Sequence, residues 1–225
     1  MRLVHMEMGI NILFKDNLVN IIVIENPQFM TKVLQELYLQ SEGEQGGFVL
    51  SEGDKLLPLS KSLVYVMQPI TISLNDKKFL NKIYQEIKEG VEERYIENKT
   101  KINSMIVEFL AQIQEEVVYP LDFEPELDVV GLMKLFDVKI EENKSYLAER
   151  IIEYIKLLSQ LCGYKVFVFV NLKMYLTKQE LKYLYESVFY SKINLILIEN
   201  IDRGINDDEE GCIIDKDGCL ISLEK

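Results

Sequence analysis

Residues 165–199, KVFVFVNLKMYLTKQELKYLYESVFYSKINLILIE, indicate the class of fold most directly. They hold two apolar runs, at 166–170 and 193–198, which lack the period-two alternation of a half-exposed strand and are typical of strands buried on both faces. Between the runs, Thr177 and Glu180 have the spacing of a capping box at the start of a helix. We therefore expect a βαβ unit within a parallel sheet.

A further apolar run, residues 21–24, is expected to form another buried strand of this sheet. In many nucleotide-binding proteins such a strand leads into a glycine-rich phosphate loop. Here it leads into Glu25, Asn26 and Pro27, of which Asn26 suits an N-cap and Pro27 the first helical turn. No G-x-x-x-x-G-K-[ST] motif occurs, and Asn171 stands where a magnesium-binding Asp is expected. The sequence predicts an α/β nucleotide-binding scaffold without its active residues.

The composition of the chain argues against several classes of protein. The chain has 225 residues, 48% of them hydrophobic, and a formal charge of −12. No apolar run approaches the roughly 18 residues of a membrane span, and the first residues lack the apolar core of a secretory signal. Three cysteines without C-x-x-C spacing argue against a disulfide framework, and a single histidine argues against most histidine-dependent chemistry. We expect a cytoplasmic globular protein with His5 at its surface.

The middle of the chain is expected to be helical. Apolar residues at helical spacing predict helices over about 75–92, 101–118, 127–136 and 144–161. The first two are joined by a short polar link, which favours an antiparallel pair. We predict two domains: a discontinuous head of residues 1–74 and 162–225, and an inserted helical leg of residues 75–161.

Several short motifs occur in the order and spacing of a known family. They are VLQELY at 33–38, NSMI at 103–106, GLMK at 131–134, VKIE at 138–141, VFVN at 168–171, YLTKQE at 175–180 and CIID at 212–215. Together with the missing phosphate loop, they make the chain similar to the Csn2 family, the accessory adaptation proteins of type II-A CRISPR systems. The resemblance runs nearly end to end and implies a degenerate P-loop-NTPase-like α/β head with a mostly parallel sheet plus an inserted helical leg.

The resemblance also implies a function. Members form a homotetrameric ring without known catalytic activity, which threads double-stranded DNA by its free ends and assists spacer acquisition in antiviral defence. The implied partners are the CRISPR integrase proteins and the RNA-guided effector nuclease, with no membrane; the implied cofactor is structural calcium, with no nucleotide. A ring can be acidic outside and basic within, so inward lysines would give sequence-independent, salt-sensitive DNA binding despite the net charge.

The resemblance implies a DNA-binding role for five lysines. Lys134 and Lys139 stand at lysine positions of the family, and Lys99, Lys101 and Lys165 lie near other basic positions. The family lysine that precedes its Ser-Met-Ile is Asn103 here, so one phosphate contact is missing. A single surface lysine more often serves solubility than ligand binding, and this alternative remains open for each of the five.

The acidic segment at 122–128 matches the position of the family's acidic hinge, where carboxylates could bind calcium. The expected ligands are Glu116, Asp122, Glu124, Glu126 and Asp128. The family tends to carry a carboxylate where this chain has Gly131. The alternative is a solvated acidic loop whose last residues favour a helix N-terminus.

Two rival functions stay open. The first is an atypical P-loop-type nucleotide-binding enzyme, an NTPase or kinase, which measurable ATP turnover would establish. The second is a protein-only scaffold of the adaptation complex, whose lysines never meet DNA. A set of aromatic residues could suggest base stacking but is expected in the core or a subunit interface. The set comprises Tyr183, Tyr185, Phe189 and Tyr190.

Overall fold

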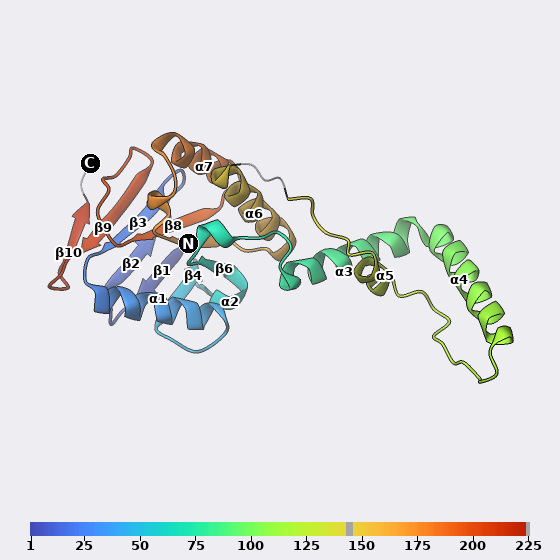
Figure 1. Cartoon of the computed structure of the whole chain (residues 1–225). Coiled ribbons are helices and arrows are strands. Elements are labelled where there is room, and N and C mark those ends of the chain that lie inside the picture. The colour runs from blue at the N-terminus through green and yellow to red at the C-terminus, as the bar shows by residue number, and fades with distance from the viewer. Residues whose placement is uncertain (143–145, 224–225) are drawn as a thin grey trace. The chain divides into compact units, whose positions relative to one another are not determined.

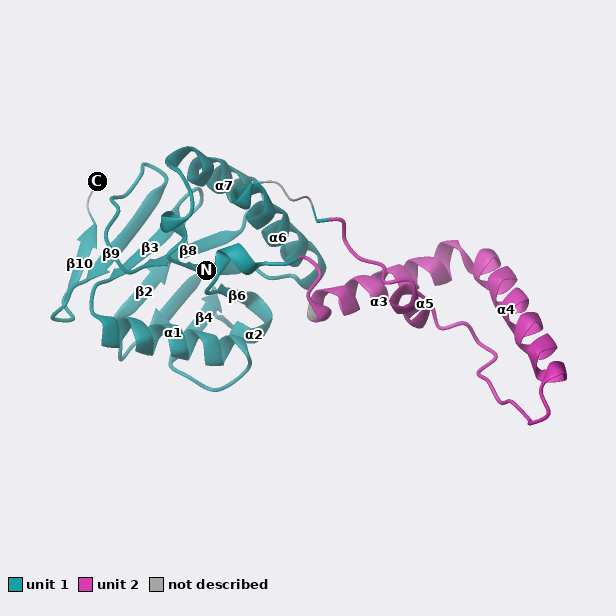
Figure 2. Cartoon of the chain, viewed as in Figure 1, with its two compact units in different colours: residues 1–73, 142–225 teal, residues 74–141 magenta. Residues whose placement is uncertain are grey.

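The computed structural model describes residues 1–142 and 146–223 and divides into two compact units (Figures 1 and 2). Unit 1 comprises Met1–Ser73 and Glu142–Lys225, and unit 2 comprises Leu74–Glu141. The mixed α/β character expected from the sequence is confirmed. The boundary differs from the predicted one, because helix α6 (Leu147–Cys162) belongs to unit 1 and contacts α7 (Lys178–Tyr190) there. Lys144, the expected start of this helix, lies outside the described residues.

A six-stranded sheet forms the centre of unit 1. Its spatial order is β10-β9-β3-β8-β7-β6; β10 pairs antiparallel with β9, and the other neighbours pair in parallel. The strands are β3 (Val19–Ile24), β6 (Leu63–Val66), β7 (Val166–Val170), β8 (Asn194–Glu199), β9 (Glu209–Ile214) and β10 (Leu220–Leu223). Strands β7 and β8 flank α7 in the chain and are parallel neighbours, so the predicted βαβ unit is confirmed.

A second, four-stranded antiparallel sheet was not anticipated from the sequence. Its order is β2-β1-β4-β5. The strands are β1 (Arg2–His5), β2 (Ile10–Leu13), β4 (Phe48–Glu52) and β5 (Lys55–Leu57). These strands have three to five residues, which is too short for the alternation of apolar and polar residues to identify a strand. Their pairing is therefore decided by packing rather than by local sequence.

The core of unit 1 lies on both faces of the six-stranded sheet. On one face, Ile22, Val168 and Ile196 pack in one apolar cluster with α1 (Pro27–Ser41) and the second sheet. Helices α6 and α7 cover the opposite face (Figure 1), where their buried residues include Leu158 and Leu184. Burial of each such side chain contributes about 1.5–3 kcal/mol relative to exposure. The short helix α2 (Leu59–Ser62) leads into β6.

The capping box of α7 forms as predicted. The Thr177 hydroxyl accepts a hydrogen bond from the backbone N–H of Glu180, and the Glu180 carboxylate accepts one from the backbone N–H of Thr177 at 2.8 Å. The Thr177 hydroxyl and N–H both donate to this carboxylate and hold the pKa of Glu180 below its usual range. Two otherwise unpaired donors at the helix start are thus satisfied.

Thr177→Ala is expected to lower the free energy of unfolding by about 1 kcal/mol, because α7 loses its N-cap. Urea denaturation followed by circular dichroism measures this. Thr31→Ala is the control, since the Thr31 hydroxyl donates only to the Pro27 carbonyl one turn back in its own helix, a bond that adds little to helix stability. Equal losses in the two variants would contradict the assigned cap.

Unit 2 contains α3 (Lys77–Arg94), α4 (Ile96–Glu116) and α5 (Val129–Leu135). Helix α3 contacts both others, and Tyr84 fixes the following chain by donating to the Val138 carbonyl at 2.6 Å. The expected antiparallel pair does not form: Tyr95 alone separates α3 from α4, and α4 leaves at an angle (Figure 1). One residue is too short a connection for the chain to reverse.

A membrane-spanning helix was not expected from the sequence. Within residues 1–142 and 146–223, no helix combines the length and the apolar character needed to cross a bilayer.

Candidate functional site

The five candidate DNA-binding lysines are divided between the two units. Lys99 and Lys101 lie on α4, Lys134 lies on α5, and Lys139 follows α5, all in unit 2. Lys165 immediately precedes β7 in unit 1. The structure therefore gathers four of the five in one compact unit.

Three of these lysines have acidic partners. Lys139 Nζ lies 2.6 Å from Asp137 Oδ2, Lys165 Nζ lies 2.6 Å from Glu52 Oε2, and Lys99 Nζ lies 3.4 Å from Glu126 Oε1. The hydrogen bond from Lys139 to Asp137 raises the pKa of Lys139, and the Lys165 ammonium lowers the pKa of Glu52. A paired ammonium attracts a phosphate less than a free one, because its neighbouring carboxylate repels the phosphate.

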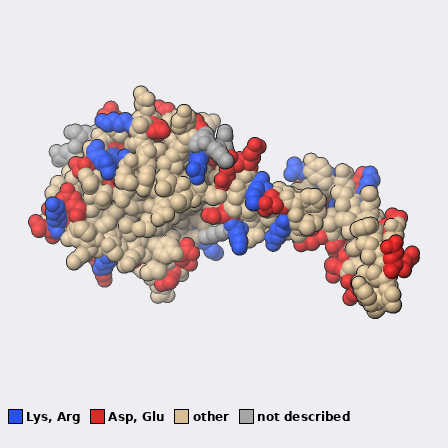
Figure 3. All heavy atoms as spheres, in the orientation of Figure 1, with Lys and Arg blue, Asp and Glu red and all other residues tan. Residues whose placement is uncertain are grey.

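Lys101 and Lys134 are exposed, and within the described part of the chain neither forms an ion pair. On the face shown in Figure 3, Lys and Arg are scattered among Asp and Glu rather than merged into one basic patch. Among the five candidates, Lys101 and Lys134 are thus the two without an acidic partner in the described part of one copy, which makes them the best of the five for contact with phosphate.

The candidate calcium ligands do not converge on one point. Both Asp128 carboxylate oxygens cap α5, accepting from the N–H groups of Val130 and Gly131, and Glu126 pairs with Lys99. Glu116, Asp122 and Glu124 are exposed along α4 and the segment after it. Across residues 1–142 and 146–223, no group of three or more Asp, Glu, His or Cys side chains could hold a metal ion. Within one copy these residues do not fit a calcium ion, which takes six to eight oxygen ligands.

Asn103 has a structural role. Its side-chain amide donates to the Pro125 carbonyl at 3.0 Å and accepts from the Leu127 N–H at 2.7 Å. These two bonds hold the segment after α4 against the helix. Asn103 therefore fixes the position of the acidic segment.

The N-terminus of α1 is closed to phosphate. Asn26 Oδ1 accepts from the N–H groups of Gln28 and Phe29, each at 3.0 Å, and Pro27 provides no N–H. A phosphate bound after a first strand relies on such free N–H groups. The predicted N-cap is confirmed, so the N–H groups of Gln28 and Phe29 are not free to bind a phosphate.

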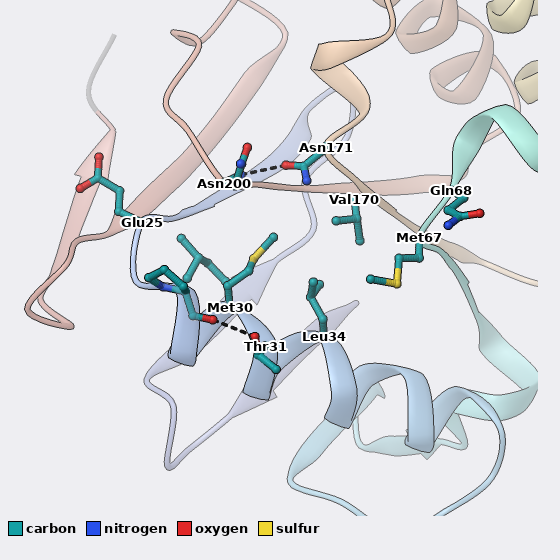
Figure 4. A pocket seen from close by; sticks show the side chains of 11 residues that line it. Glu25, Met30, Thr31, Leu34, Met67, Gln68, Val170, Asn171 and Asn200 are labelled. Carbon is teal, nitrogen blue, oxygen red and sulfur yellow. Dashed lines mark hydrogen bonds between the residues drawn. The ribbon is translucent and has the colours of Figure 1, made fainter.

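A pocket of about 560 Å³ lies at the carboxyl ends of four parallel strands of unit 1 (Figure 4). In open α/β sheets, ligands commonly bind outside the carboxyl ends of the parallel strands. Its lining residues are Ile24, Glu25, Pro27, Met30, Thr31, Leu34, Met67, Gln68, Val170, Asn171 and Asn200.

Asn171 shapes one wall of this pocket. Its backbone is left-handed, with φ 53°, an uncommon conformation that Asn tolerates better than most residues. Its Oδ1 accepts the N–H of Asn200 at 2.9 Å, which leaves its Nδ2 as a donor (Figure 4). Asn171, the residue after β7, thus joins the ends of β7 and β8.

A buried charged cluster was missed by the sequence analysis. Glu209 is fully buried; it accepts from Lys173 Nζ at 2.7 Å and from the Tyr185 hydroxyl at 2.6 Å. Nearby Glu199 accepts the Lys173 N–H at 3.0 Å, and burial raises its pKa. The four residues come from different elements, so no local motif could reveal them. The cluster fixes the loop between β8 and β9, because Lys173 Nζ also donates to the Gly204 carbonyl.

The expectation of a surface His5 was wrong. His5 is 2% exposed, its Nε2 lies 2.9 Å from Glu36 Oε1, and its Nδ1 accepts the Met8 N–H at 3.2 Å. A side chain at Gly47 would place a Cβ 2.5 Å from His5 Nε2. His5 is therefore a core residue, and its ring leaves no room for a side chain larger than that of glycine at position 47.

The aromatic residues of α7 divide into two groups. Tyr185 is 1% exposed, as expected of a core residue, and Phe189 is half-buried. Tyr183 and Tyr190 are 54% and 91% exposed, so of the two expected locations, the core or a subunit interface, the core is excluded for them. Helical spacing alone cannot separate these positions, because α7 carries aromatic residues on both its buried and its exposed sides.

Comparison with known proteins supports the resemblance found in the sequence. A family model described as CRISPR-associated protein (Cas_Csn2) matches residues 40–218. The CRISPR-associated protein Csn2 of Streptococcus agalactiae is 26% identical over 207 residues, which cover 89% of this chain and 89% of the relative. The Csn2 protein of Enterococcus faecalis is 24% identical over 173 residues, covering 74% and 76%. Because the family match spans more than half of this chain, the chain belongs to the Csn2 family of CRISPR-associated proteins.

Proposed function

We propose that this protein is a non-enzymatic ring of four copies that binds double-stranded DNA at its ends and acts in CRISPR spacer acquisition. In this proposal the ring works in the cytoplasm beside the integrase proteins and the RNA-guided effector nuclease. Its contacts with DNA are made to phosphates and are independent of base sequence.

The observation that carries the proposal is the exposed apolar stripe of α4. None of the residues 96–116, all of which the structure describes, is buried. The stripe comprises Ile102, Met105, Ile106 and Phe109, which are 37–70% exposed and recur at helical spacing. A helix in a protein gains most of its stability from packing its apolar face against another element. We therefore expect this stripe to be covered by another protein surface. A second copy supplies an identical stripe and is the simplest partner.

Two features of unit 1 support the absence of catalysis in this proposal. The helix that would bind a phosphate is capped by its own Asn26, and among the described residues that line the pocket, Glu25 is the sole charged one. Nucleotide hydrolysis normally needs cationic groups or a metal around the phosphates. ATP turnover by the pure protein would favour the enzyme alternative instead.

In this proposal calcium binds only to the assembled protein, between carboxylates of different copies. The carboxylates of one copy do not form a site, and we assign no step to the ion. A second copy could add oxygen ligands to the exposed carboxylates after α4.

The test is a gel-shift comparison of linear and covalently closed circular duplexes of one sequence, at fixed calcium and salt. We expect binding to the linear form alone, because a closed ring loads only from an end. Equal binding to both forms would indicate an open groove, and binding to neither would favour the protein-only scaffold. A parallel series with EDTA is expected to weaken binding; unchanged binding would remove calcium from the proposal.

Lys101→Gln with Lys134→Gln is expected to weaken DNA binding and its salt dependence, because both ammonium groups are exposed and unpaired. The slope of log affinity against log salt should become shallower by about 0.9 for each phosphate that the variant no longer neutralises. Fluorescence anisotropy at several salt concentrations measures it. The control, Lys55→Gln with Lys61→Gln, makes the same change in net charge in unit 1. An unchanged slope, together with normal spacer acquisition, would favour the protein-only scaffold.

A further inference from the structure

The pocket in Figure 4 has a chemistry that differs from a nucleotide site. Its lining combines apolar side chains with carboxamides. Met30, Leu34 and Val170 are 8%, 9% and 3% exposed and form an apolar base, and the exposed Met67 lies beside them. Methionine side chains adapt to flat ligands and make favourable contacts with aromatic rings.

Three carboxamides stand around this apolar base: Gln68, Asn171 and Asn200. The Asn171 oxygen is engaged with the Asn200 N–H. Gln68 and Asn200 are exposed, and their side-chain amides make no hydrogen bond with any residue that the structure describes. Each of these two amides offers an acceptor and two donors, a set that matches the edge of a nucleobase and, in bidentate form, the N6 and N7 atoms of adenine.

The same pocket disfavours phosphate. Glu25 is the one charged side chain among its described lining residues, and it is negative. The N–H groups at the start of α1 are taken by Asn26. A phosphate near this pocket would meet a carboxylate and no free donor from the helix, so each added phosphate should weaken binding.

We propose that this pocket binds a purine base, with the ring against Met30, Leu34, Met67 and Val170 and the polar atoms at its two ends on the amides of Gln68 and Asn200. The base can come from a free nucleoside or from an unpaired nucleotide at a DNA end. The second source rests on the proposed function; the first does not. A volume of about 560 Å³ is enough for either.

The first experiment titrates adenosine, AMP and ATP into the full-length protein and follows binding by saturation-transfer NMR. We expect adenosine to bind and ATP to bind about tenfold more weakly, the order opposite to that of a nucleotide enzyme. The double variant Gln68→Ala with Asn200→Ala should lose adenosine binding. Gln35→Ala with Gln179→Ala removes two exposed amides of unit 1 outside the pocket and should retain it. Tighter binding of ATP than of adenosine, or equal binding by both double variants, would overturn the proposal.

The second experiment identifies the source of the base. A duplex ending in one unpaired 2-aminopurine is compared with a blunt duplex in which the same base is paired. Entry into an apolar pocket without a stacked neighbour is expected to raise the fluorescence of the unpaired base, and Gln68→Ala with Asn200→Ala should abolish the rise while the gel shift persists. A gel shift without the rise, combined with adenosine binding, assigns the pocket to free nucleosides. A protein that binds adenosine but no DNA refutes the ring proposal and leaves the pocket standing, and one that binds neither adenosine nor the unpaired base refutes the pocket.

Discussion

Met105→Glu combined with Phe109→Glu is expected to reduce the assembly to smaller species and to abolish stable binding to linear DNA. The two side chains are 70% and 61% exposed and lie on the same stripe of α4. If a second copy covers them, each contributes about 1.5–3 kcal/mol of burial per copy. A carboxylate in their place would have to be desolvated opposite an apolar surface. Sedimentation velocity at several protein concentrations measures the change in size.

The control for this variant places the same charges on the opposite side of the helix. Ser104→Glu and Ala111→Glu lie about half a turn away from the stripe, and both positions are exposed. We expect this pair to sediment and bind DNA as the wild type does, with equal helix content by circular dichroism in both variants. A wild type that sediments as a single copy would contradict the assembly, as would a stripe variant of unchanged size.

The sequence predicted the centre of unit 1 because local signals coincide there with the final packing. The runs at 166–170 and 193–198 became buried parallel neighbours, and Thr177 and Asn26 became caps. The second sheet escaped prediction because it joins β1 to β4, more than forty residues along the chain. In so short a strand, pairing depends on the partner rather than on the residues themselves.

The candidate site was predictable only at the level of residue types. The sequence placed lysines and carboxylates in unit 2, but whether a lysine is free depends on its neighbours in space. Lys139 faces Asp137, whereas Lys101 has no acidic partner among the described residues. Likewise, a row of carboxylates indicates a cation site only if they converge, and here Asp128 caps a helix instead. The pocket amides Gln68 and Asn200 come from separate strand ends, so no motif links them.

Glu209→Ala is expected to cost about 3–5 kcal/mol of unfolding free energy, because it leaves a buried ammonium without its partner. Lys173 is 5% exposed and Glu209 is fully buried; the Tyr185 hydroxyl and the Asn206 N–H also lose their acceptor. An unsatisfied buried donor carries the full cost of its desolvation. Urea denaturation monitored by fluorescence of the tyrosines measures the change.

The matched comparison for this ion pair is Lys139→Ala, which breaks a pair of similar length, 2.6 Å against 2.7 Å, at the surface. We expect that variant to unfold almost as the wild type does, because exposed pairs contribute little. Lys173→Met with Glu209→Gln should recover part of the stability, since neither buried charge remains. The cluster also holds the loop that begins at Asn200, so Glu209→Ala should weaken adenosine binding even where the protein remains folded. If Glu209→Ala is no more destabilising than Lys139→Ala, the cluster does not stabilise unit 1.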